Sequence, residues 1–258
     1  MSQILVGTSG FSYPDWKARF YPEGMRQENF LEFYSSQFRA VELNFTYYRM
    51  PDEKQSKMLI EKSGGSLEFV IKANRQMTHE IPEDSLEKIA PLFLEGIAPF
   101  IQAGQLGAIL LQFPQSFHYT TKNRIYLKSL INKLRPHNIS VEFRQREWLK
   151  DSVYRSLHNL DAGFVCVDEP DLPSLIPSVI NSTSDVGYIR FHGRNKEKWY
   201  SGDSRTRYDY LYSEEELLDW VPKIRNIADR TDKLYAFFNN HAKAQAPTNA
   251  RMLINLLD

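Results

Sequence analysis

Charged and polar residues recur at the ends of short apolar runs in this chain. Four of them are of the types that exchange protons with a substrate: Glu42, Glu142, Asp168 and His192. A second set has side chains or backbone groups suited to holding a polar ligand: Asn44, Lys72, Gln112, Arg144, Arg190, Gly193, Arg194, Asn239, Asn240 and Thr248. We therefore expect a site in which carboxylates do acid and base work while cations and amides orient the substrate.

The apolar runs that carry these residues have the length of β-strands. There are eight of them: ILVGTS (4–9), AVELNF (40–45), LEFVIKA (67–73), GAILLQF (107–113), ISVEFR (139–144), GFVCVD (163–168), GYIRFH (187–192) and LYAFFN (234–239). Alternate residues of a strand face opposite ways, so Glu42 and Asn44 lie on one face and Val41 and Leu43 on the other. The same split in all eight runs predicts that the polar ends converge on one site.

Segments with helical spacing of apolar residues separate the runs. They span 26–38, 51–62, 83–103, 121–134, 148–160, 214–229 and 247–257, and Pro91 and Pro99 predict two helices or a kinked one within 83–103. Alternating strands and helices favour a parallel sheet, and eight strands close into a TIM (β/α)8 barrel with a packed interior. Three prolines between 169 and 186 predict an irregular crossover between strands six and seven.

The loops after strands seven and eight give the most specific signal for an anion. The glycine of Gly193-Arg194-Asn195 lets the backbone approach a ligand, and Pro247 suits the first turn of the last helix, whose N–H groups would face the barrel mouth. Such barrels frequently hold phosphate at these loops. We expect Arg144, Arg190, Arg194 and this helix N-terminus to bind the anion.

The segment from 190 to 207 is basic and is followed or interrupted by aromatic residues. Arginine beside aromatic rings is typical of single-stranded nucleic-acid binding, which gives an alternative function without turnover. We expect a set of aromatic side chains to wall the barrel mouth: Tyr13, Trp16, Tyr47, Tyr48 and Trp199.

Three other chemistries compete for the same residues. Glu42 and Glu142 would suit an acid and base pair of a glycosidase. A divalent metal among Glu42, Glu142, Asp168, His192 and His241 would make the protein a metal-dependent hydrolase, although no ligand spacing fixes such a site. Lys72 would form a Schiff base if desolvated, but nearby carboxylates favour its charged form. His79, after the third strand, is a candidate acid or base in a loop.

Composition limits the class of protein. With 258 residues, 32 acidic and 32 basic residues and a pI near 7.0, the chain fits one barrel domain over 1–258 and has no overall field for nucleic acid or membranes. No apolar stretch is long enough to cross a membrane, and no leader segment is evident, so a cytoplasmic location is expected. The single cysteine, Cys166, lies inside a predicted strand as a buried hydrophobe.

Several segments of the sequence resemble the domain of unknown function 72 family, also called YecE-like. They are GTSGFSYPDWKARFYP (7–22), VELNFTYYRMP (41–51), THE (78–80), LLQFP (110–114), VEFR with Trp148, VDEP (167–170), RFHGR (190–194) and FFNNHAKAQAPTNA (237–250). The resemblance covers almost the whole chain and implies a TIM-type barrel, without implying a reaction. Gln145 stands where many relatives carry a histidine.

The sequence thus predicts a single barrel whose mouth binds a small anionic ligand, phosphorylated or nucleotide-like. An enzyme of the hydrolase or isomerase type acting on a phosphorylated substrate is the leading hypothesis. No cofactor is predicted, and the nucleic-acid-binding and metal-dependent alternatives stay open.

Overall fold

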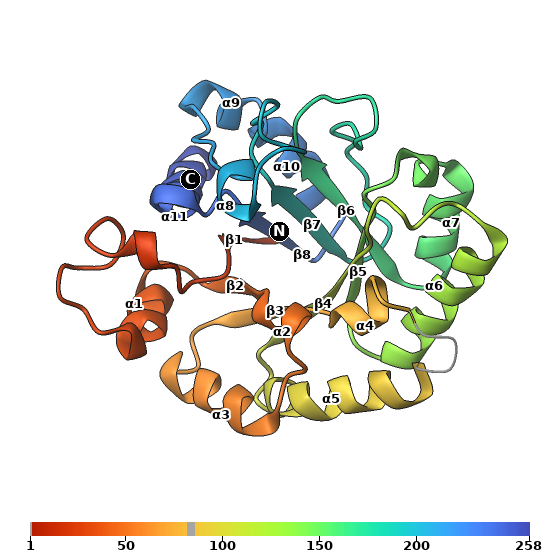
Figure 1. Cartoon of the computed structure of the whole chain (residues 1–258), viewed down its shortest axis with the longest axis horizontal. Coiled ribbons are helices and arrows are strands. Elements are labelled where there is room, and N and C mark those ends of the chain that lie inside the picture. Colours follow the sequence, from red (N-terminus) through yellow and green to blue (C-terminus); the bar gives the residue numbers. More distant parts are fainter. Residues whose placement is uncertain (1, 82–85) are drawn as a thin grey trace.

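Eight parallel strands form a closed barrel in which each strand pairs with the next and β8 pairs with β1 (Figure 1). The computed structural model describes residues 2–81 and 86–258. The strands are β1 (Gln3–Ser9), β2 (Ala40–Leu43), β3 (Glu68–Lys72), β4 (Leu106–Gln112), β5 (Ile139–Glu142), β6 (Ala162–Asp168), β7 (Val186–Phe191) and β8 (Lys233–Phe238). All eight predicted strands and the TIM-barrel fold are confirmed.

Helices surround the barrel and connect its strands (Figure 1). The α-helices are α1 (Phe30–Gln37), α2 (Phe45–Tyr48), α3 (Glu53–Lys62), α4 (Arg75–Thr78), α5 (Leu86–Gln102), α6 (Thr121–Leu134), α7 (Asp151–Asn159), α8 (Ser204–Arg207), α9 (Glu214–Leu218), α10 (Val221–Ala228) and α11 (Gln245–Leu257). Four short 3-10 helices complete the described part: η1 (Pro14–Trp16), η2 (Gln27–Asn29), η3 (Arg146–Trp148) and η4 (Ala242–Ala244).

Helix boundaries follow local capping chemistry where a polar side chain is available. The Asp52 carboxylate accepts from the Gln55 N–H at 2.9 Å to begin α3, and the Thr120 hydroxyl accepts from the Asn123 N–H at 3.2 Å to begin α6. Each cap satisfies a backbone donor that has no partner within the helix. The predicted span of 121–134 agrees with α6 at both ends.

One helix prediction differs from the structure, and a second segment, for which two helices or a kinked one were expected, forms one helix. The segment 214–229 forms two helices, α9 and α10, with Trp220 buried at the junction, rather than one. In the segment 83–103, residues 83–85 lie outside the described residues, and the rest is one helix that continues through Pro91 and Pro99. Phe93 and Ile97 of this helix are fully buried in the hydrophobic core.

The crossover between β6 and β7 has no helix, as predicted. Side chains replace the missing backbone ladder in this connection. The Thr183 hydroxyl accepts from the Phe164 N–H at 2.8 Å and donates to the Ala162 carbonyl at 2.6 Å. The Glu169 carboxylate accepts from the Ile176 N–H at 3.1 Å. These bonds hold the irregular chain against the barrel wall.

Candidate functional site

The strand register decides which polar strand ends face the barrel interior. Residues paired across parallel strands lie on the same face of the sheet. Ser9 pairs with Glu42, and Gln112 pairs with Glu142. The Glu42 and Glu142 carboxylates both contact Arg190 of β7. These side chains therefore meet inside the barrel, near the carboxyl ends of the strands, where the sequence predicts the site.

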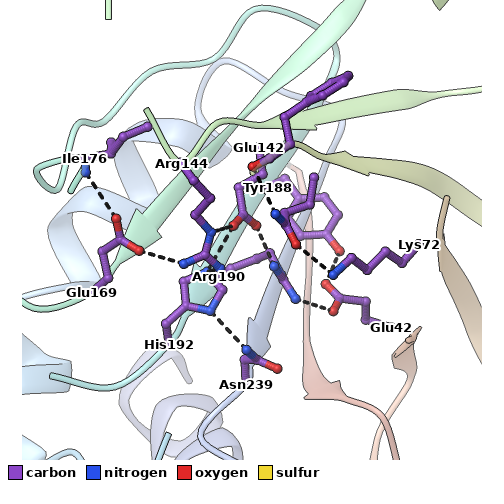
Figure 2. Close-up of polar contacts among 12 residues, drawn as sticks. Glu42, Lys72, Glu142, Arg144, Glu169, Ile176, Tyr188, Arg190, His192 and Asn239 are labelled. Carbon is purple, nitrogen blue, oxygen red and sulfur yellow. Dashed lines mark hydrogen bonds and ion pairs between the residues drawn. The ribbon is translucent and has the colours of Figure 1, made fainter. Parts of the chain in front are cut away.

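A chain of ion pairs fills this part of the interior (Figure 2). Arg190 Nη2 donates to Glu42 Oε1 at 2.7 Å, and Arg190 Nη1 donates to Glu142 Oε2 at 2.5 Å. Arg144 Nε lies 2.6 Å from Glu142 Oε1, and Arg144 Nη1 donates to Glu169 Oε2 at 2.9 Å. We call these five residues the interior ion-pair chain. Its residues lie in β2, β5 and β7 or in the loops directly after β5 and β6.

The interior ion-pair chain is shielded from solvent. Glu42, Glu142 and Glu169 have fully buried side chains, and Arg190 is 2% exposed. Burial opposes the charged form of Glu142, but Arg144 and Arg190 outweigh it and hold the pKa of Glu142 well below its usual range. Burial raises the pKa of Glu169 to about 7, against the opposing effect of Arg144. Glu142 is thus a fixed anion, whereas Glu169 titrates near neutrality.

His192 is buried among polar partners. Arg144 Nη2 lies 3.0 Å from Nε2 of His192, and Glu142 Oε1 lies 3.3 Å from the same nitrogen. Burial, together with Arg144, lowers the pKa of His192 to about 3. The Asn239 amide lies 3.1 Å from Nδ1 on the other side of the ring. His192 is therefore neutral at physiological pH and braces Arg144.

Asp168 lies on the opposite face of the barrel wall from the interior ion-pair chain. Val167 pairs with Arg190, so the adjacent Asp168 points outward, toward the helices. Its carboxylate accepts from Tyr212 Oη at 2.8 Å and from Trp220 Nε1 at 2.8 Å. Arg194 completes the set, with Nη2 2.6 Å from Asp168 Oδ2. The expectation that Asp168 joins the inward-facing polar strand ends is therefore wrong, and Arg194, which we expected to bind an anion, bonds Asp168.

The groups expected to bind an anion near the last helix bond the protein itself. Gly193 has φ of +84°, which suits glycine, and its N–H donates to Tyr212 Oη at 2.8 Å. Asn240 Nδ2 donates to the Tyr210 carbonyl at 2.8 Å. The Thr248 hydroxyl donates to the Ala244 carbonyl at 2.9 Å, inside the first turn of α11. These three positions stabilise the loops after β7 and β8.

A pocket of about 540 Å³ opens beside the interior ion-pair chain. It brings together parts of several loops at the carboxyl ends of the strands. The lining residues named by the sequence prediction are Lys72, Gln112, Arg144, Tyr47, Tyr48 and Trp199, with His79. The lining residues that the site prediction did not include are Pro114, Gln115, Leu175, Tyr200, Gly202, Asp203, Arg207 and Tyr208. Six of the predicted site residues therefore share one ligand-sized cavity.

Lys72 and His79 are two titratable groups of this pocket. Lys72 Nζ donates to Gln112 Oε1 at 2.8 Å and lies 4.5 Å from the centre of the Tyr47 ring. Burial, and then Arg190, lowers the pKa of Lys72 to about 7. Burial, and then Lys72, lowers the pKa of His79 to about 4, so this imidazole is neutral at physiological pH.

Tyr13 and Trp16 do not line the pocket but fix the loop after β8. The Tyr13 ring stacks on His241 with ring centres 4.5 Å apart, and Trp16 Nε1 donates to the His241 carbonyl at 2.7 Å. Asn44 begins α2, and its amide oxygen is buried without a hydrogen-bond partner in the described part of the chain. Gln145, on the loop after β5, donates to the Gln115 carbonyl at 3.3 Å and is peripheral to the interior ion-pair chain.

The residues expected to bind a metal do not form one cluster. Glu42 and Glu142 are joined to Arg190, His192 Nε2 lies 3.3 Å from Glu142 Oε1, and Asp168 lies across the barrel wall from them. Within residues 2–81 and 86–258, no three His, Cys, Asp or Glu side chains are grouped in a way that could hold a metal ion. None of the helices described there is both long and apolar enough to cross a membrane.

The fold and site define a (β/α)8 barrel with a buried ion-pair chain beside a pocket rich in aromatic side chains. The chain belongs to the DUF72 family, described as "Protein of unknown function DUF72", whose family model matches residues 5–258. The family resemblance seen in the sequence is thus confirmed.

Similar proteins span nearly the whole chain. The UPF0759 protein YunF of Bacillus subtilis is 28% identical over 99% of this chain and 95% of its own length. A DUF72 family protein of Thermotoga maritima, known from a crystal structure, is 39% identical with a TM-score of 0.92 and 99% coverage of both chains. An Enterococcus faecalis DUF72 protein is 25% identical with a TM-score of 0.87, over 99% of this chain and 95% of its own.

Proposed function

We propose that this chain binds a small anionic ligand, phosphorylated or nucleotide-like, in the pocket at the barrel mouth and performs acid–base or hydrolytic chemistry on it. Arg207 carries this proposal. Its guanidinium lines the pocket and forms no ion pair with any carboxylate that the structure describes, and its Nε is buried without a hydrogen-bond partner. An arginine without a counter-ion is suited to phosphate.

The surroundings of Arg207 support an anionic ligand. Asp203 also lines the pocket, but its carboxylate accepts from the N–H groups of Arg205 and Thr206 at the start of α8. Arg144 adds positive charge at the pocket floor, although its donors contact Glu142, Glu169 and His192. Arg190 and Arg194, which the sequence suggested as anion-binding residues, bond carboxylates of the protein, so we assign anion binding to Arg207 instead.

The other lining residues suit the rest of such a ligand. Tyr47, Tyr48, Tyr200 and Tyr208 offer ring faces or edges, and the amides of Gln112 and Gln115 offer donors and acceptors. Glu42 and Glu142 are engaged with arginine and do not line the cavity, so we assign the acid–base work to His79 and Lys72. Both have pKa values displaced toward the neutral form.

Nucleic-acid binding remains the second candidate because of two exposed aromatic rings on the pocket lining. Tyr48 is 72% exposed and Tyr200 is 57% exposed, and Lys196 and Lys198 are exposed on the same loop as Tyr200. Exposed rings beside lysines can stack bases and contact phosphates. Arg194 is excluded from this set because it bonds Asp168.

Calorimetric titration with inorganic pyrophosphate tests the small-anion proposal. We expect saturable binding that Arg207→Ala weakens about tenfold or more, since a charged hydrogen bond is lost. Arg205→Ala is the matched control, because Arg205 lies on the same short helix, is 67% exposed and does not line the pocket. Equal affinities for wild type and Arg207→Ala would contradict the proposal.

Titration with a single-stranded oligonucleotide separates the two candidates. Binding that weakens steeply with salt, and that Lys196→Ala with Lys198→Ala abolishes, would support the nucleic-acid function. Binding of pyrophosphate without binding of the oligonucleotide would support the small-molecule function.

A further inference from the structure

Lys72 lies in an arrangement that differs from that of an ordinary ion-paired lysine. It ends β3, and its ammonium nitrogen contacts the neutral Gln112 side chain at 2.8 Å and the face of Tyr47. No carboxylate of the described residues lies within ion-pair distance of it. In Figure 2 the side chain points from its strand toward Glu42 and Tyr188, beside the interior ion-pair chain.

The two carboxylates that act on Lys72, Glu42 and Glu142, each bond at least one arginine. Glu42 bonds Arg190 and Tyr188, with Tyr188 Oη 2.7 Å from Glu42 Oε2. Glu142 bonds Arg190 and Arg144. The sequence-based expectation that these carboxylates keep Lys72 charged is therefore not supported by their pairing. Arg190 and Arg144 disfavour a positive charge on Lys72.

Charged groups from several strands change the pKa of Lys72. Burial and Arg190 lower its pKa most, Arg144 lowers it further, and Glu142 and Glu42 raise it, to give about 7. His79 and Tyr47, from the loops after β3 and β2, lie against the same cavity. An ordinary lysine is neutral in only about one molecule in a thousand near pH 7. A large fraction of Lys72 is neutral under the same conditions.

We propose that Lys72 is a nucleophilic amine that forms an imine with an aldehyde or ketone carrying an anionic group. The cavity, its size and the residues around Lys72 point to this chemistry. Lys72 and Arg207 line the same pocket of about 540 Å³, so one small molecule can place its anion at Arg207 and its carbonyl at Nζ. The inference that the substrate carries an anionic group rests on the proposed function. The inference that Lys72 is a nucleophile is independent of it.

The step balances without an oxidant or reductant. The neutral amine attacks the carbonyl carbon, a C–N bond forms, and the π electrons of the carbonyl move to oxygen. A first proton passes from nitrogen to that oxygen and gives a carbinolamine. A second proton then protonates the hydroxyl, which leaves as water while the nitrogen lone pair forms the C=N bond, and the nitrogen gives up its remaining proton, so that both of its protons end on the water. His79 is neutral, lines the pocket and packs edge-on against Tyr47 with ring centres 4.8 Å apart. It can accept the proton from nitrogen and return it to the departing hydroxyl.

Reductive trapping on the wild-type protein tests the proposal. Glycolaldehyde phosphate and glycolaldehyde are each added with cyanoborohydride, which reduces any imine to a stable secondary amine. Labelling is kept below one modification per chain, and peptide mass spectrometry compares Lys72 with the exposed Lys57 and Lys198. We expect Lys72 to be labelled at least about tenfold faster than either at pH 7, because a larger fraction of it is neutral. Labelling no faster than at these two lysines would overturn the proposal.

The pH dependence gives a second readout. The labelling rate at Lys72, divided by that at Lys57 under the same conditions, should fall toward one as the pH rises from about 7 to about 10, because the exposed lysine also becomes neutral. A ratio that stays flat across this range would contradict a nucleophile that is neutral near pH 7.

Arg207→Ala separates this proposal from the anion site. It should slow labelling of Lys72 by glycolaldehyde phosphate at least about tenfold more than labelling by glycolaldehyde, because only the former carries the anion. Preferred labelling of Lys72 by both aldehydes without any effect of Arg207→Ala would support the nucleophile and contradict the anion site. Pyrophosphate binding that depends on Arg207, without preferred labelling of Lys72, would contradict the nucleophile alone.

Discussion

Arg190 and Glu142 form an ion pair of 2.5 Å in which the glutamate is fully buried and the arginine is 2% exposed. The same guanidinium also bonds Glu42 at 2.7 Å, so one cation joins two carboxylates from β2 and β5 across the barrel interior. Removing one partner of such a pair leaves a buried charge without compensation. We therefore expect the ion pairs of Arg190 to stabilise the barrel, in addition to lying beside the pocket.

The first prediction concerns Arg190. Arg190→Met should lower the free energy of unfolding by about 3–5 kcal/mol, because Glu42 and Glu142 would lose their shared partner. Urea unfolding followed by far-ultraviolet circular dichroism measures the change. Arg205→Ala, at an exposed position, should stay within about 0.5 kcal/mol of wild type. Adding Glu42→Gln and Glu142→Gln to Arg190→Met should recover part of the loss, and no recovery would contradict the charge explanation.

The second prediction separates a structural role of Asp168 from a catalytic one. Asp168→Ala removes the acceptor of Tyr212 Oη, Trp220 Nε1 and Arg194, so we expect a loss of about 2–5 kcal/mol in the free energy of unfolding. Pyrophosphate affinity should not change, since Asp168 does not line the pocket. Asp219→Ala, on the exposed surface beside Trp220, serves as the control. A weaker affinity at unchanged stability would show that Asp168 acts on the ligand.

The third prediction is a pH dependence that belongs to Glu169. Its folded-state pKa of about 7 is above that of an exposed glutamate, so the folded chain binds the proton more tightly than the unfolded chain. Its stabilising contribution is present below about pH 4 and is lost as the pH rises toward 7. Relative to Glu169→Gln, the wild type should lose up to about 3 kcal/mol over this range.

Urea unfolding of wild type and Glu169→Gln at several pH values checks this prediction. Glu214→Gln, at an exposed position, should follow the wild-type pH profile. A constant difference between wild type and Glu169→Gln from pH 4 to 7 would mean that the Glu169 pKa is not raised.

The fourth prediction concerns Cys166. Burial raises the pKa of this thiol to about 12, and its sulfur contacts the Asn181 carbonyl at 3.3 Å. A thiol-reactive disulfide reagent should therefore not modify the folded protein near pH 8, since the reactive species is the thiolate. One thiol per chain should react after unfolding in guanidinium chloride. Rapid modification of the folded protein would contradict the buried position.

Much of the fold could be predicted from the sequence because its strands and helices differ in apolar spacing and in their end signals. The eight apolar runs became β1–β8, and the proline-rich segment after Asp168 became the irregular crossover. The helix α6 begins and ends where its cap and its apolar spacing predict. These features depend on residues close together along the chain.

The direction of each strand-end side chain could not be predicted in the same way. Strands of a parallel barrel are buried on both faces, so their residues are apolar on both sides. In β6, Phe164, Val165, Cys166 and Val167 are all buried, and nothing in this run shows which face is inside. The sequence pattern therefore does not predict that Asp168 lies on the outer face of the barrel wall, where the structure has it. Glu169, one residue later, could have been considered, because it follows the same strand.

The sequence by itself determined that eight strand ends with polar side chains would meet at one end of a closed barrel. Only the tertiary structure decided which of those charges cancel one another and which line a cavity. Arg190 and Arg144 bond carboxylates from other strands, whereas Arg207, 135 residues after Lys72, comes to the same pocket without such a partner. Charge pairing acts over a few ångströms, and the chain brings those atoms together only when the barrel closes.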